Sequence, residues 1–128
     1  PKVFRLSEQY LIRAEARANQ KNYSGASKDL SDLRRARFQG GNGSISVSEQ
    51  NWLEIIEEER VRELYMEGFR LQDLKRWHKG FERKPQEQSL TNGSSLKIEA
   101  DDVRFVWPIP KHELESPGSQ IQPNESNK

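Results

Sequence analysis

Residues 59–77 read ERVRELYMEGFRLQDLKRW, and their charged and apolar residues alternate at the period of an α-helix. Acidic and basic residues repeatedly stand three positions apart, as Glu59 and Arg62 do, and as Glu67 and Arg70 do. An exposed pair at this spacing contributes only about 0.3 kcal/mol. So many charges beside so many apolar residues therefore predict a partly buried ionic network that joins two helices. Such a network selects one arrangement of helices more than it adds stability.

We expect this network to be structural, because arginines close in the sequence hold carboxylates in their ionised form. Its predicted members are Glu59, Arg62, Glu63, Glu67, Arg70 and Asp73. A metal site built from Glu57, Glu58, Glu59 and Glu63 would lack a nearby histidine, since the histidines of the chain are His78 and His112. We therefore expect no metal, no cofactor, no catalytic residue and no enzymatic activity.

Length and composition narrow the class of protein. The 128 residues suit one domain or part of a larger one. Hydrophobic and charged residues each make up 32% of the chain, and the mean hydropathy is −1.02. This apolar content is low for a domain that forms a hydrophobic core by itself. A net charge of +1 gives no global attraction to nucleic acid. Because the chain opens at Pro1 rather than Met, we expect a fragment of a larger protein.

Upstream of the charged stretch, apolar spacing predicts a helical hairpin in residues 1–38. Residues 4–20 form its first helix, the segment from Asn22 to Gly25 breaks the pattern, and a second helix runs to about Phe38. The apolar residues expected on the facing sides of this pair are Tyr10, Leu11, Ala14, Ala18, Ala26, Leu30 and Leu33. Tyr10, Ala14, Tyr23, Ala26 and Leu30 stand at the offsets of a tetratricopeptide-like pair of antiparallel helices.

Residues 47–80 are predicted to hold the helices of the charged stretch. Ser48 is expected to cap a helix that stops near Gly68, and a short helix over residues 71–79 follows. Residues 81–128 read as a loop or weak hairpin with an Asn92-Gly93 turn, then a strand at Val103–Trp107, and an extended tail. The predicted fold is mainly α, with tetratricopeptide-like hairpins, long loops and a short C-terminal strand segment.

Three tryptophans are candidates for ligand binding, because an aromatic face can stack on a sugar ring. They are Trp52, Trp77 and Trp107. The chain has few large apolar residues, so we expect at least two of the three to pack in the core instead. The residues that contact ligand are otherwise unknown from the sequence.

Four motifs occur here in the order found in one protein family. They are LSEQYLIRAEA (residues 6–16), ASKDLSDLRRAR (26–37), ERVREL with EGFRLQDLKR (59–64 and 67–76), and WPIPKHE (107–113). Together they resemble the C-terminal half of SusD/RagB proteins over nearly the whole chain. Four motifs in register are far more specific than any one of them.

The resemblance implies a surface-exposed outer-membrane lipoprotein of Bacteroidetes-type bacteria. Such a protein captures glycan or peptide nutrients and passes them to a SusC-like TonB-dependent transporter, and it is not an enzyme. Its scaffold is an α-α superhelix of tetratricopeptide-like helix pairs, and its lipid anchor lies at an N-terminus that this chain does not include. This chain would be scaffold, with Tyr10, Leu11, Ala14 and Leu30 bare and facing upstream helices.

One alternative stays open. A tetratricopeptide-like hairpin also suits an adaptor that binds partner peptides inside the cell. A lipoprotein signal upstream of this chain would belong only to the nutrient-binding protein, so that observation separates the two hypotheses.

Overall fold

The computed structural model describes residues 5–38, 40, 43–84 and 96–127. The described residues fall into two compact units, one that ends at Phe69 and one that begins at Arg70. Each unit is described by itself.

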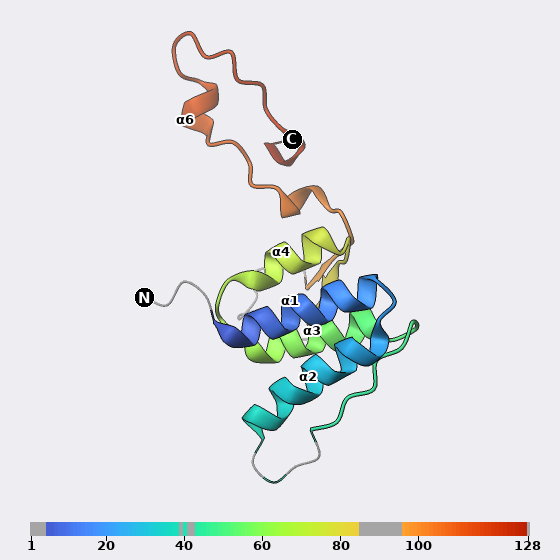
Figure 1. Ribbon diagram of the computed structural model, residues 1–128. Helices are drawn as coiled ribbons and strands as arrows, with labels where there is room; N and C mark the ends of the chain where they lie inside the picture. Colours follow the sequence, from blue (N-terminus) through green and yellow to red (C-terminus); the bar gives the residue numbers. More distant parts are fainter. Residues whose placement is uncertain (1–4, 39, 41–42, 85–95, 128) are drawn as a thin grey trace. The chain divides into compact units, whose positions relative to one another are not determined.

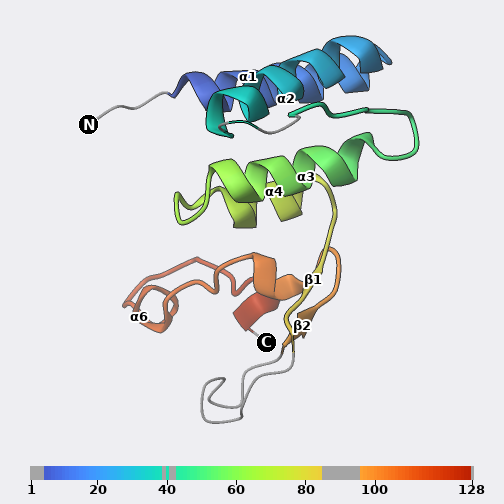
Figure 2. The same cartoon turned by 90° about the horizontal axis from the view of Figure 1, so that it is seen from below.

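The first unit is built from three helices, α1 (Leu6–Asn19), α2 (Tyr23–Arg37) and α3 (Trp52–Glu63). Helix α1 packs against both of the others. Helices α2 and α3 run in the same direction, opposite to that of α1 (Figures 1 and 2). The predicted helical hairpin is thus confirmed, and a third helix completes the unit.

The core of this unit is small and lies where the three helices meet. Leu11 and Ala14 of α1, Leu30 of α2 and Ile56 of α3 are completely buried. The expectation that Leu11, Ala14 and Leu30 are bare is therefore wrong, because α2 and α3 already cover them. The exposed apolar side chains of α1 are instead those of Leu6 and Ile12.

The turn between α1 and α2 is tighter than the sequence suggested. Lys21 adopts a left-handed φ of 62°, and the Asn22 side chain then accepts a hydrogen bond from the Gly25 N–H at 3.0 Å. This side chain caps α2, so the helix begins at Tyr23. The predicted break over Asn22–Gly25 is wrong, since three of its four residues are helical.

Helix α3 is shorter at both ends than predicted. The Asn51 side chain accepts a hydrogen bond from the Ser48 N–H at 2.7 Å, and the Ser48 carbonyl accepts one from the Trp52 N–H at 3.1 Å. These bonds form a turn at Ser48, and the helix starts four residues later. It ends at Glu63, well before Gly68.

The second unit opens with α4 (Phe69–Arg76), whose first residue is the last of the first unit. The helix ends in a Schellman turn, with a hydrogen bond of 2.9 Å from the Lys79 N–H to the Leu74 carbonyl. His78 occupies the left-handed position of this turn, with a φ of 52°. Its imidazole Nδ1 lies 2.8 Å from Oδ1 of Asp101.

A small antiparallel sheet follows, made of β1 (Phe81–Glu82) and β2 (Lys97–Ile98), with Phe81 opposite Ile98. Gly80 precedes it, and a Cβ atom at this position would lie 2.2 Å from the Ile98 carbonyl oxygen. The weak hairpin expected within residues 81–102 is confirmed. The predicted Asn92-Gly93 turn lies outside the described residues.

The strand predicted at Val103–Trp107 is wrong. Val103–Phe105 form a 3₁₀ turn, η1, because Asp102 caps it through a hydrogen bond of 2.9 Å from the Arg104 N–H. Phe105 is the buried residue of that turn. The fold is mainly helical as predicted, and the strands among the residues that the structure describes are β1 and β2.

A short helix, α6 (Lys111–Leu114), precedes the tail. The tail from Ser116, predicted to be extended, is so only in part, because it ends in a 3₁₀ turn, η2 (Glu125–Asn127). The Asn127 side chain accepts a hydrogen bond from the Ile109 N–H at 3.0 Å and donates one to the Ile109 carbonyl at 2.8 Å. Asn124 Nδ2 donates to the Trp107 carbonyl at 2.9 Å. These three bonds, named here the asparagine clasp, close the tail on itself.

Within the described ranges, no helix combines the length and the apolar character that a membrane crossing needs.

Candidate functional site

Glu59 of α3 is a buried carboxylate held by two arginines. Its side chain is only 6% exposed. Arg34 of α2 donates from Nη2 to Glu59 Oε1 at 2.5 Å, and Arg62 donates from Nη1 to the same oxygen at 2.5 Å. The predicted pairing of Glu59 with Arg62 is present, and a second arginine joins it from another helix.

Glu63 lies one turn further along α3 and repeats this arrangement. Arg37 donates from Nε to Oε2 at 2.9 Å and from Nη2 to Oε1 at 2.5 Å. Arg5 Nη2 donates to the Glu63 carbonyl at 2.8 Å and lies 2.9 Å from Oε1 of Glu67. The hydrogen bonds from Arg37 lower the pKa of the Glu63 carboxyl, although partial burial acts in the opposite direction.

These contacts form a ladder between two helices. Arg34 and Arg37 stand one turn apart on α2, as Glu59 and Glu63 do on α3, so each arginine meets one carboxylate. Arg5 adds a link from the start of α1. The ladder thus fixes how α2 and α3 lie along their shared neighbour α1.

The six residues predicted for the network divide between the two units. Glu59, Arg62, Glu63 and Glu67 lie in the first unit, while Arg70 and Asp73 lie in the second. Asp73 is buried and contacts Arg76 Nε at 3.0 Å. Sequence reasoning missed Arg5, Arg34 and Arg37. The sequence does contain a feature that could have identified Arg34 and Arg37. These two arginines are spaced by about one helical turn, as Glu59 and Glu63 are.

A further buried carboxylate, Asp29 of α2, was also missed. It is 1% exposed. Arg13 of α1 binds both of its oxygens, at 3.1 Å from Nε and 2.7 Å from Nη2, and Arg17 Nη1 lies 2.7 Å from Oδ2. The sequence feature that could have revealed it is an aspartate next to Leu30, on the helix face that was predicted to be apolar. These contacts tie α2 to α1.

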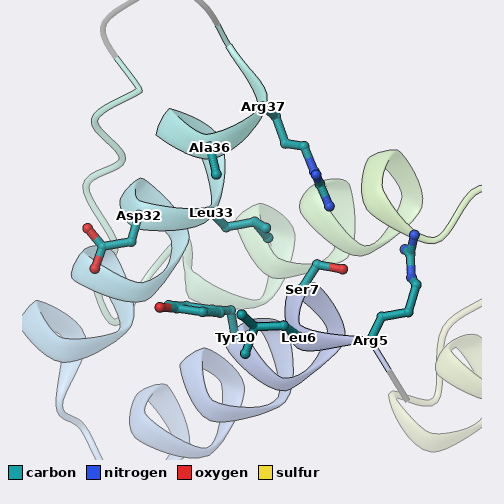
Figure 3. Close-up of a pocket in the computed structure, with 8 residues that line it drawn as sticks. All are labelled: Arg5, Leu6, Ser7, Tyr10, Asp32, Leu33, Ala36 and Arg37. Atoms are coloured by element: carbon teal, nitrogen blue, oxygen red, sulfur yellow. The ribbon is translucent and has the colours of Figure 1, made fainter. Parts of the chain in front are cut away.

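A pocket of about 490 Å³ lies between the N-terminal half of α1 and the C-terminal half of α2. In Figure 3 the side chains of Leu6 and Tyr10 lie on one side of it, facing Leu33 and Ala36 on the other. Arg5 and Arg37 lie at one end, and Asp32 lies at the opposite end. Its lining residues are Arg5, Leu6, Ser7, Tyr10, Asp32, Leu33, Ala36 and Arg37.

A smaller hollow of about 290 Å³ adjoins this pocket and shares Leu6 and Tyr10 with it. Ile12 and Arg13 also line it. We call the two together the α1–α2 groove. Asp32 in the groove contacts Lys28 Nζ at 2.6 Å and Arg35 Nη1 at 3.1 Å. The hydrogen bond from Lys28 lowers the pKa of the Asp32 carboxyl, so this group is ionised at neutral pH.

The groove is suited to binding apolar groups between charged ends. In the part of the chain that the structure describes, no three histidine, aspartate or glutamate side chains cluster as metal ligands would. The carboxylates that line or adjoin the groove are engaged by arginine or lysine, which suits holding helices together.

The three candidate tryptophans differ in exposure. Trp52 and Trp77 are half-buried, and the Arg76 guanidinium lies 4.3 Å from the centroid of the Trp77 ring. Trp107 is 81% exposed. The asparagine clasp holds the backbone on its C-terminal side, at the Trp107 carbonyl and at Ile109. Trp107 therefore presents a free ring on a fixed backbone.

Comparison with protein families gives a match over nearly the whole chain. The model of the SusD family matches residues 2–125, a range that contains the helical hairpin, the ladder and Asn124 of the asparagine clasp, while Asn127 of the clasp lies just beyond it. No curated protein and no solved structure matches the chain. The match covers far more than half of the sequence and includes all four motifs. The chain therefore belongs to the SusD family.

Proposed function

We propose that this chain is scaffold of a cell-surface nutrient-binding lipoprotein that hands glycan or peptide to a SusC-like TonB-dependent transporter. The observation that carries this proposal is the SusD-family match over residues 2–125. Proteins of this family bind nutrients rather than transform them, and they are associated with the outer membrane. The proposal therefore assigns no catalytic step to the chain.

The ionic ladder supports a scaffold role. Its carboxylates, Glu59 and Glu63, come from the charged stretch that is most characteristic of the family. Both form ion pairs with arginines of neighbouring elements. The chain has no cysteine, the residue that carries a lipoprotein anchor. In this proposal the anchor therefore lies outside residues 1–128, and the protein sits on the outer face of the outer membrane.

Trp107 is the described residue that best suits contact with a glycan. A large aromatic ring that is 81% exposed offers a stacking face to a sugar. Pro108 and Pro110 restrict the backbone around it, and the clasp holds it further. Little conformational entropy would therefore be lost when a sugar binds. Trp52 and Trp77 offer less free ring surface.

Location tests the general proposal. Antibody against the chain, applied to intact cells of the source organism, should label the surface, and the transporter should copurify from gently solubilised outer membranes. Labelling that appears only after the cells are opened, with the protein in the soluble fraction, would overturn the proposal. That result would favour the intracellular adaptor.

Affinity electrophoresis tests the assignment of Trp107. The natural protein would be run through gels that contain soluble starch, xylan or pectin. Trp107→Ala should remove most of the retardation in the gel that retards the unaltered protein, while Trp107→Phe keeps part of it. Trp52→Phe is the matched control and should run unchanged. Equal retardation of Trp107→Ala and the unaltered protein would rule out this residue as a glycan contact.

A further inference from the structure

Two serines of α2 hold the chain that follows this helix. The Ile45 N–H donates to Ser31 Oγ at 2.9 Å, and the Val47 N–H donates to Ser27 Oγ at 2.9 Å. The Ser27 hydroxyl donates its own proton to the Tyr23 carbonyl at 2.8 Å. A hydroxyl has one proton and two lone pairs, so this bond leaves the lone pairs of Ser27 for the Val47 N–H.

The two bonds match the repeat of a helix to the repeat of an extended chain. The serines stand four residues apart, which is about 6 Å along a helix. The residues whose N–H groups bind them stand two apart, which is about 6.6 Å along an extended chain. Because these lengths nearly agree, both bonds form at once. An extra residue between Ile45 and Val47 would leave one serine without its donor or turn the Val47 side chain to the opposite face.

Burial along this segment alternates in the same way. The buried or half-buried residues are Gly43, Ile45 and Val47, and the exposed residues between them are Ser44 and Ser46. Successive side chains of an extended chain point to opposite faces, so one face of the segment lies on the helix. Gly43 supplies a third contact, because a Cβ atom there would lie 3.0 Å from the Arg35 backbone nitrogen.

We call residues 43–47 the strap. It runs back along α2, toward the end of the molecule at which α3 begins (Figures 1 and 2). Arg34 lies seven residues beyond Ser27 on α2, and Glu59 lies seven residues beyond Trp52, the first residue of α3. Seven residues rise by about 10 Å in either helix. The pairing of Arg34 with Glu59 therefore requires α3 to begin level with Ser27, which is where the strap ends.

From these contacts we infer that the strap sets the register of α3 along α2, and that Ser27 and Ser31 are positioning residues for the ionic ladder. By returning the chain to Ser27, the strap brings the start of α3 to the level at which its two glutamates meet the two arginines of α2. This device involves no ligand, so it holds whether or not the chain binds glycans.

Hydrogen exchange followed by nuclear magnetic resonance tests the two bonds. Ser31→Ala should make exchange at the Ile45 amide about fivefold faster or more, because the amide loses its acceptor. Ser27→Ala should do the same at the Val47 amide. Ser46→Ala, at an exposed serine of the strap, is the matched control and should leave both rates unchanged. Unchanged exchange in both Ser31→Ala and Ser27→Ala would overturn the inference.

An insertion tests the register. One alanine inserted between Ile45 and Ser46 moves the rest of the strap out of register with the serines, whereas one alanine inserted after Gly40 only lengthens the loop before the strap. The readout is the titration midpoint of the Glu63 carboxyl, because the hydrogen bonds from Arg37 hold its pKa below the ordinary 4.5. The insertion within the strap should raise this midpoint toward 4.5, and the insertion before the strap should leave it low.

Circular dichroism shows whether the variant with the insertion in the strap folds. If it does not, the double variant Ser27→Ala with Ser31→Ala takes its place and should raise the midpoint by a smaller amount. An unchanged midpoint in the folded variant would overturn the inference. An equal rise for both insertions would also overturn it, since loop length rather than the strap would then position α3. Glycan retardation that depends on Trp107 does not enter these measurements, so the two proposals fail separately.

Discussion

The two units of this protein are held together in different ways. In the first, three helices share a core of fully buried side chains, and carboxylates of one helix are bound by arginines of another. In the second, the buried apolar side chains among the described residues are those of Leu74 and Phe105. Its other contacts include the hydrogen bonds of the turn after α4 and those of the asparagine clasp. The first unit is thus stabilised mainly by buried side chains. The second is stabilised by hydrogen bonds within a segment that has little regular secondary structure.

This difference shows how a sequence that is 32% hydrophobic can still fold. Its apolar residues are concentrated in one unit rather than spread thinly over two. The other unit relies on glycine, proline and asparagine to fix its backbone. Substitutions should therefore have large effects on stability in the first unit and small, local effects in the second.

The largest effect is expected for Leu30→Ala. Leu30 is completely buried between helices, and removing its side chain should leave a cavity that costs about 2–5 kcal/mol of unfolding free energy. Urea unfolding followed by circular dichroism measures this loss. Ile121→Ala, at a half-exposed apolar residue of the second unit, is the control and should cost much less. Equal losses would mean that the two units do not differ as described.

The next effect is expected at Glu63. Glu63→Gln should lower the unfolding free energy by about 1–3 kcal/mol at neutral pH, because its hydrogen bonds to arginine lose their charge. The folded protein lowers the pKa of Glu63 from its ordinary 4.5, so the carboxylate stabilises the fold above that pH. This contribution is lost as the pH falls through the lowered value. The difference between the variant and the unaltered protein should accordingly shrink below pH 4.5, and a difference that persists there would contradict the ladder.

A smaller and more local effect is expected from Asn127→Ala. The substitution removes both hydrogen bonds between this side chain and the Ile109 peptide, at about 1 kcal/mol each. Hydrogen exchange at the Ile109 amide should become about tenfold faster or more, while amides of α1 exchange at an unchanged rate. Asn22→Ala removes a side-chain cap in the first unit and serves for comparison. Faster exchange across both units would mean that the clasp stabilises more than the local backbone.

The smallest effect is expected at Asp102. Hydrogen bonds from the Arg104 side chain and N–H lower the pKa of the Asp102 carboxyl to about 2. This exposed pair should contribute to stability only above the ordinary pKa and lose that contribution as the pH falls toward 2. Titration followed by nuclear magnetic resonance should give a midpoint near 2, and Arg104→Ala should move it toward 3.8. The urea midpoint of Arg104→Ala at neutral pH should fall only slightly, because an ion pair this exposed to solvent contributes little to stability.

The sequence was sufficient for the four longer helices, α1 to α4, but not for their ends or for the short helix α6. Apolar spacing predicted the hairpin, because Leu11, Ala14 and Leu30 recur at helical intervals. The start of α3 escaped prediction because Asn51 and Ser48 bond each other in a turn, so the residue that looks like a cap is not at the helix. Val103–Trp107 looked like a strand from its apolar residues, yet the Asp102 cap turns that segment into a 3₁₀ turn.

The site was only partly predictable for a related reason. Spacings of three and four reveal pairs such as Glu59 with Arg62, but Arg34 reaches Glu59 from 25 residues away and only the packing of helices brings them together. The α1–α2 groove depends on where two helices leave space between their ends, and no pattern in one sequence encodes that space. Trp107 was a candidate from the sequence, but the sequence did not reveal that its ring is exposed or that the asparagine clasp holds its backbone.

The close approach at Gly80 limits which mutations this protein can accept during evolution. Every other amino acid that the genetic code can supply brings a β-carbon, which would lie 2.2 Å from the Ile98 carbonyl oxygen. The backbone fixes the position of that carbon, and the opposing atom also belongs to the backbone, so no change of rotamer relieves the clash. As long as β1 and β2 stay paired, only synonymous changes to the Gly80 codon are neutral.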